Sequence, residues 1–176
     1  MVLAYSMASR DLARGQFMTA FAQFAQDASR LGVVKNAMAA ERIKDHPTVA
    51  AHSAMYQTIR PSVQELRALV ETLEPRLKVL RLECERLGLP IELVQLSDLL
   101  LRSFQLDREQ LALFERELAL NQEMESALPG DRARFFNERI APLWKQDEPL
   151  EARHLAIQEE ILAIQTTIHQ KTRRKD

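Results

Sequence analysis

Glycine is scarce in this sequence, with only four residues in 176. Tight turns, β-hairpins and phosphate-binding loops depend on glycine, so its scarcity argues against strand-rich folds and against nucleotide-binding loops. Leucine, alanine, glutamate, glutamine and arginine dominate the sequence instead, and all five are strong helix formers. The composition therefore predicts an all-α protein that is long enough to bury a hydrophobic core.

Cysteine is even rarer, and the single residue, Cys84, excludes an intramolecular disulfide. It lies on an apolar stripe, where a thiol is more typical of a small buried hydrophobe than of a nucleophile. A structural zinc site needs four convergent cysteine or histidine ligands, and one cysteine with four scattered histidines offers no such spacing. No serine lies in a Gly-x-Ser-x-Gly elbow. We therefore predict no metal, no cofactor and no catalytic residue.

Long apolar runs are also missing, because no stretch approaches the roughly 18 apolar residues of a membrane span. The N-terminal Met-Val-Leu-Ala-Tyr-Ser lacks the basic flank of a signal peptide. We therefore expect a cytoplasmic protein without a membrane partner. Arginine outnumbers lysine, which favours a GC-rich bacterial genome.

Neither sign of charge prevails, since the net charge is −1 although 28% of the residues are charged. Interleaved charges leave no overall field that would attract nucleic acid. The one basic concentration follows the last predicted helix, at Lys171, Arg173, Arg174 and Lys175. A solubilising helix end explains it most simply. The alternative is a nucleic-acid contact that also uses Arg132, Arg134 and Arg139.

Helical periodicity is what the sequence has in abundance. Spacings of three and four residues connect a long apolar series: Val63, Leu66, Val70, Leu73, Leu77, Leu80, Cys84 and Leu87. This heptad repeat predicts a helix over 62–87 that packs lengthwise against another helix. Pro75 falls opposite this seam, so we predict one bent helix rather than two. A second seam follows the same rule near the C-terminus, at Leu150, His154, Ile157, Ile161, Ile164 and Ile168.

Local start and stop signals divide the remainder of the chain. We predict helices over 9–31, 33–59 with a break at 45–47, 91–104, 107–128, a short one near 135–141, and 149–168. The boundaries rest on stop and start residues such as Gly32, Asp107 and Pro149. The expected fold is an elongated antiparallel helical bundle of about five to seven helices with coiled-coil-like seams. We divide it into an N-terminal helical region over 1–60, which could bind a partner, and a bundle core over 61–176, within one domain overall.

An aromatic helix face is the best candidate for partner binding. Phe17, Phe21 and Phe24 lie on one side of the first helix, and no charge occurs between Gly15 and Gln26. Such a face would form a large exposed patch if nothing covered it, so burial in the bundle is the competing interpretation. A second candidate face contains Leu111, Phe114 and Leu118.

His154 is the residue with the most suggestive spacing. Glu151-x-x-His154 matches the pattern that di-iron helical bundles use twice, but the sequence has no second copy. We therefore predict that His154 interrupts the apolar seam as a polar residue that fixes the helix register or contacts a carboxylate.

These observations favour a non-catalytic helical interaction protein, such as a chaperone, an immunity protein or an adaptor. Its partner would be another protein or a second copy of the chain, which includes a homodimer. One alternative is a nucleic-acid-associated factor that uses the basic C-terminal residues. The other is a small-ligand-binding bundle with a pocket near Trp144 and His154.

Overall fold

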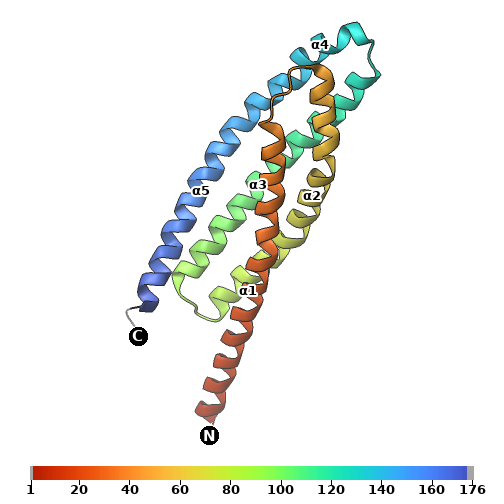
Figure 1. The fold of residues 1–176 in the computed structure, drawn as a ribbon. Helices are drawn as coiled ribbons and strands as arrows, with labels where there is room; N and C mark the ends of the chain where they lie inside the picture. The colour runs from red at the N-terminus through yellow and green to blue at the C-terminus, as the bar shows by residue number, and fades with distance from the viewer. Residues whose placement is uncertain (1, 174–176) are drawn as a thin grey trace.

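Four long helices make up most of the part of the chain that the structure describes. The computed structural model describes the backbone of residues 2–173 and the side chains of residues 11–171. The long helices are α1 (Val2–Arg42), α2 (Val49–Arg86), α3 (Ile91–Ser126) and α5 (Ala141–Arg173). They run alternately up and down along one axis, so both chain ends lie at the same end of an elongated molecule (Figure 1). The all-α class and the antiparallel arrangement that the sequence predicts are confirmed.

The number of helices differs from the prediction of five to seven, because several predicted boundaries lie inside continuous helices. These are Gly32, Ser62, Asp107 and Pro149. A glycine within a helix costs only about 1 kcal/mol relative to alanine, which packing along a long helix outweighs. Asp107 does not cap a helix, since it is buried and its carboxylate contacts side chains of other helices. Local end signals were therefore overruled by contacts between helices.

Two prolines lie within α2, and the helix continues through both. Pro61 and Pro75 are exposed, so each ring, and the backbone carbonyl that lacks a partner, can face water instead of the core. The prediction of one helix across Pro75 is confirmed, although this helix begins earlier than predicted. It starts after Thr48, whose hydroxyl accepts a hydrogen bond from the Ala51 amide at 3.1 Å.

The connections between helices follow the turn signals of the sequence more closely. The predicted break at 45–47 lies between α1 and α2. Gly88 ends the α2 region with a φ of +58°, a conformation that residues with a Cβ rarely adopt. Between α3 and α5 the chain forms a 3₁₀ turn (Pro129–Asp131), the short α4 (Arg132–Phe135) and a π-helical turn (Phe136–Ile140).

The first predicted seam forms the centre of the core. Seven of its eight residues are buried, and only Leu87 is half-buried. They belong to a cluster that also contains Phe24 of α1 and Phe114 of α3. The second seam is covered over part of its length: Leu150, His154 and Ile157 are buried, whereas Ile161 and Ile164 are half-buried. The boundary at residue 60 falls inside α2, and α1 packs into the same core as the rest of the chain.

Candidate functional site

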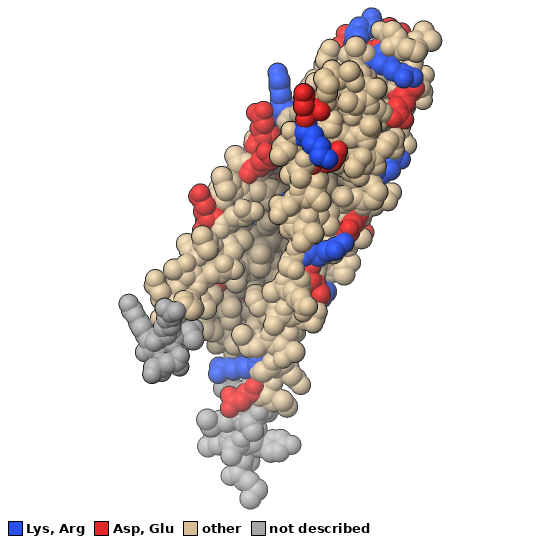
Figure 2. Space-filling view, viewed as in Figure 1, with Lys and Arg blue, Asp and Glu red and all other residues tan. Residues whose placement is uncertain are grey.

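The bundle is open along one side. α1 packs on α2, α2 on α3, and α3 on α5, but across the described residues α1 and α5 form no comparable interface. A closed four-helix bundle would bury that fourth pair of faces as well. Figure 1 shows α1 and α5 apart, with α3 between and behind them, and Figure 2 shows the surface hollowed between them.

This hollow, which we call the interhelical groove, has a volume of about 460 Å³. Its walls are α1 and α5, and its floor is formed by Gln110 and Phe114 of α3. The lining residues from α1 are Lys35, Asn36, Met38, Ala39 and Arg42, and Ile43 follows directly after this helix. Those from α5 are Trp144, Asp147, Glu148, Glu151, His154, Leu155 and Gln158.

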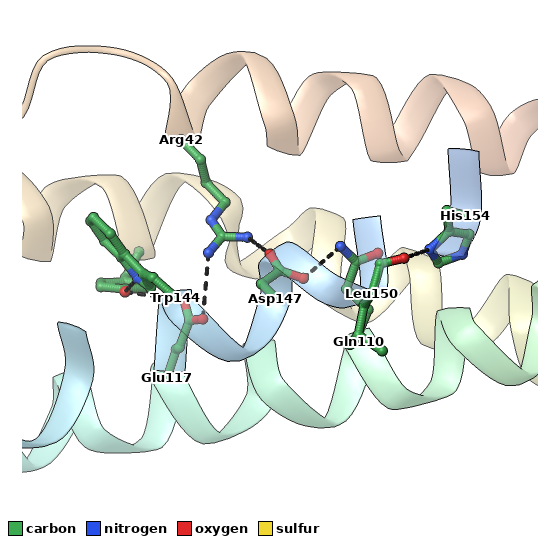
Figure 3. A network of polar contacts seen from close by, with 8 residues as sticks. Arg42, Gln110, Glu117, Trp144, Asp147, Leu150 and His154 are labelled. Atoms are coloured by element: carbon green, nitrogen blue, oxygen red, sulfur yellow. Dashed lines mark hydrogen bonds and ion pairs between the residues drawn. The ribbon is translucent and has the colours of Figure 1, made fainter. Parts of the chain in front are cut away.

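Arg42 and Asp147 form the first link across the groove. The guanidinium Nη1 donates to Asp147 Oδ2 at 2.5 Å, and the Gln110 amide donates to the other carboxylate oxygen at 2.8 Å. The guanidinium carbon also lies 4.7 Å from the centre of the Phe114 ring, a cation–π contact. Figure 3 shows the side chains of Arg42, Gln110 and Asp147 converging from α1, α3 and α5.

Glu117 is the second carboxylate near Arg42, at 3.5 Å from Nη2, and it is fully buried. Tyr56 donates its hydroxyl hydrogen to Glu117 Oε2 at 3.1 Å, and the Trp144 indole donates to the Tyr56 oxygen at 2.9 Å. Burial raises the pKa of Glu117 to about 7, and the negative charge of Asp147 adds to this while Arg42 opposes it. The Arg42 guanidinium therefore balances the charge of Asp147, and Glu117 changes its protonation state near pH 7.

Lys35, Asp107 and His154 form the second link. Lys35 Nζ lies 2.6 Å from Asp107 Oδ1, and His154 Nε2 lies 2.9 Å from the same oxygen. Burial alone would raise the pKa of Asp107, but the hydrogen bond from His154 and the charge of Lys35 hold it below its usual value. The predicted contact between His154 and a carboxylate is thus confirmed. Polar links, rather than apolar packing, join α1 to α5 here.

The predicted partner-binding residues lie mostly in the core. Phe17 and Phe24 of α1 are 5% and 2% exposed, and Phe24 contacts Phe104 of α3 edge-on at 6.5 Å. On α3, Leu111 and Phe114 are buried. Phe21 and Leu118 are half-buried and pack against the same core. Helices of the chain itself therefore cover most of both predicted faces, and burial, the competing interpretation of the aromatic face, describes Phe17 and Phe24.

The sequence-based alternative of a pocket near Trp144 and His154 falls on the groove, because both residues line it, but sequence reasoning missed its other residues and the exposed apolar side chains of α5. Leu155 and Leu162 are 58% and 64% exposed, and they follow the second seam one position away from His154 and Ile161. A helix that packs against one partner helix needs only a narrow apolar stripe. On α5 the two exposed leucines make the apolar face wider than such a stripe, and this width was the signal in the sequence that a further helix could pack there.

Three of the cations considered for nucleic acid have partners within the protein. Arg139 pairs with Glu123 at 2.6 Å, Lys171 pairs with Glu92, and Arg132 donates to the Glu125 carbonyl at 2.7 Å. Arg134 is exposed. The side chain of Arg173, with Arg174 and Lys175, lies outside the described residues.

Reactive or ligating clusters are not found in the part of the chain that the structure describes. No group of three or more histidine, cysteine, aspartate or glutamate side chains among residues 11–171 is arranged to hold a metal ion. Cys84 is fully buried, and burial raises the pKa of its thiol, which disfavours the nucleophilic thiolate. Among the described helices, none is both long and apolar enough to cross a membrane.

Comparison with protein-family models, with curated proteins and with solved structures gave no match. The chemistry of the groove must therefore be inferred from its own residues.

Proposed function

We propose that this chain is a non-catalytic interaction protein that receives a helix of another protein in the interhelical groove. The observation that supports this most strongly is the missing interface between α1 and α5. It leaves Ile43, which follows α1, and Leu155 of α5 lining the groove while 84% and 58% exposed. Exposed apolar side chains that line a groove are typical of a protein-binding site.

The shape of the groove suits a helix. Two helices that flank a groove are the arrangement in which an amphipathic helix buries its apolar face, at interaxial distances of about 8–10 Å. Aromatic groups such as Phe114 and Trp144 at the base supply the contacts that dominate binding energy in many interfaces. A chaperone, an immunity protein or an adaptor, in a bacterial cytoplasm, could each act by holding a partner helix in this way.

Filling the groove from within tests the proposal. Ala39 lines the groove and is exposed, so Ala39→Phe would occupy space that the partner needs without disturbing the core. Ala37 is exposed on the same helix but does not line the groove, which makes Ala37→Phe the matched control.

Each tagged variant would be purified from its native cells and the proteins bound to it quantified by mass spectrometry. We expect a protein that copurifies with wild type and with Ala37→Phe, and that is lost with Ala39→Phe. Size-exclusion chromatography shows whether that protein is a second copy of the chain. Identical sets of bound proteins from both variants, or no stoichiometric partner at all, would contradict the proposal.

A small-ligand-binding role is the second candidate, because polar groups converge at the deep end of the groove. Gln110, Asp147 and His154 line it beside the Trp144 ring. The hydrogen bonds that these groups already form with each other and with Arg42 and Asp107 leave few of them free for a ligand. Helix docking, which needs mainly apolar surface, is therefore the better supported role.

A further inference from the structure

The rim of the groove on α5 carries acidic side chains without internal partners. Glu148 and Glu151 are exposed and line the groove. Among the described side chains, no ion pair or hydrogen bond engages either carboxylate. Most other acidic residues facing a neighbouring helix are paired, for example Asp98 with Arg81 and Glu115 with Arg67. Figure 2 shows acidic side chains over α5 beside the hollow, while the lower part of this helix carries few charges in this view.

The cations of the groove cannot neutralise this rim, because they are engaged deeper inside. Lys35 is bound to Asp107 and Arg42 to Asp147, in links that also hold α1 to α5. Two cations thus stand against five carboxylates, namely Asp107, Glu117, Asp147, Glu148 and Glu151, so the two rim carboxylates are in excess. Since Glu117 is also buried beside Arg42, no cation is left over in the groove itself.

The exposed residues farther along the groove are uncharged. Leu155 lines the groove next to Glu151, and Leu162 lies two helical turns later on α5, beyond the residues that line the groove; both are exposed. On the opposite wall Asn36 and Ala39 carry no charge. The groove therefore combines an apolar face with an acidic patch at the end nearer the α1–α2 connection.

We propose that the occupant of the groove is a basic amphipathic helix of another protein, with lysine or arginine side chains lying against Glu148 and Glu151. This inference rests on the proposed function and adds the charge and the direction of the partner. Its apolar face covers Leu155 and Leu162, and its basic residues lie at the end nearer the α1–α2 connection. A symmetric dimer formed groove to groove would bring two acidic rims together, which like-charge repulsion disfavours.

Trp144 supplies a built-in reporter for the test. It is the only tryptophan in the chain, it lines the groove, and it is half-buried. The probes are three synthetic peptides of about 18 residues, roughly 27 Å of helix, that contain no tryptophan or tyrosine. One has a Leu/Ala face and a lysine face, one replaces the lysines by glutamates, and one scrambles the lysine peptide so that no apolar face forms. Labelled peptides are titrated by fluorescence anisotropy at about 0.1 M salt, where exposed charges still interact over about 10 Å, and Trp144 emission is followed in parallel.

Two double charge-reversal variants separate the effect of the rim carboxylates from that of the net charge of the protein. Glu148→Lys combined with Glu151→Lys reverses the rim. Glu71→Lys combined with Glu138→Lys changes the net charge of the protein equally, at exposed positions that do not line the groove. Any effect of overall charge is therefore common to both.

We expect the lysine peptide to bind wild type about ten-fold more tightly than the glutamate peptide, since each exposed charge pair contributes up to about 1 kcal/mol. The rim variant should invert this preference, the control variant should keep it, and Trp144 emission should shift on binding. If the lysine and glutamate peptides bound with equal affinity, a basic partner would be refuted. If Leu155→Lys also weakened both peptides, helix docking itself would still be supported. Binding of neither peptide would overturn the groove as a helix site, and equal binding of the scrambled peptide would reduce the interaction to non-specific attraction.

Discussion

Arg42 Nη1 lies 2.5 Å from Asp147 Oδ2, and this ion pair joins the two helices that do not pack against one another. The carboxylate is almost fully buried, and Gln110 holds its second oxygen. Buried polar groups that are satisfied in this way specify one arrangement of the helices around them. The pair therefore sets the position of α1 relative to α5, and with it the width of the groove.

Removing Arg42 should be strongly destabilising, because two buried carboxylates lose their cation. We expect Arg42→Met to lower the free energy of unfolding by about 3 kcal/mol or more in urea denaturation. Adding Asp147→Asn should restore part of this loss by removing one uncompensated charge. Arg30→Met breaks the exposed pair with Glu65 and should cost no more than about 1 kcal/mol. Equal losses for Arg42→Met and Arg30→Met would show that the buried network does not hold the helices.

The protonation of Glu117 should make stability depend on pH. Its pKa in the folded protein is about 7, raised by burial from the usual 4.5, so the native state binds the proton more tightly than the unfolded chain. The contribution of Glu117 is fully favourable below about pH 4.5 and is lost as pH rises through 7, by about 3 kcal/mol. Glu117→Gln mimics the protonated form and should remove this loss.

The measurement is the free energy of unfolding of Glu117→Gln minus that of wild type between pH 5 and 8. This difference cancels the titration of other groups, including His52, whose pKa is lowered by burial. It should become more positive as pH rises. A difference that stays constant across this range would mean that Glu117 is ionised in the folded protein throughout.

The central seam should dominate global stability. Leu73 is 1% exposed in the middle of α2, and Leu73→Ala should cost about 2–5 kcal/mol through lost burial and a cavity. Glu71→Ala, two residues earlier on the exposed face, should change stability by less than about 0.5 kcal/mol. Thermal and urea unfolding of both variants provide the comparison. Unfolding midpoints that do not differ between the two variants would show that the seam is not part of the core.

Pro75→Ala should be neutral or slightly stabilising. Proline within a helix removes one backbone hydrogen bond, and alanine restores it at an exposed position where no packing is lost. Circular dichroism and urea unfolding test this directly. A clear loss of stability would instead show that the local helix geometry set by Pro75 is needed for α2 to pack on α1 and α3.

The seams could be predicted because a heptad pattern depends only on spacing within one helix. Val63 to Cys84 are buried as the pattern requires, and a carboxylate contact of His154 could be anticipated from its place among isoleucines. Which carboxylate His154 contacts could not be predicted, because the sequence around Asp107 has the pattern of a helix N-cap. Its true partners, Lys35 and His154, are far away in the sequence.

Apart from the pocket considered near Trp144 and His154, which both line it, the groove escaped prediction for the same reason. Nothing in the sequence near Lys35 or Arg42 indicates that α1 stands apart from α5, since that depends on how four helices share one core. The aromatic residues Phe17 and Phe24 have the composition of a binding face, but α1 turns them towards α2 and α3. The exposed leucines of α5 were the more informative signal.

The most direct test of helix docking is a two-dimensional ¹H–¹⁵N NMR titration of the wild-type protein with the unlabelled lysine peptide. The account predicts that amide shifts change along the walls of the groove, over 35–43 and 147–158, at Leu162 beyond the groove on α5, and at the Trp144 indole, while the outer face of α2 around Glu71 stays unchanged. Shift changes centred on another surface, or a spectrum that does not respond to the peptide, would contradict it.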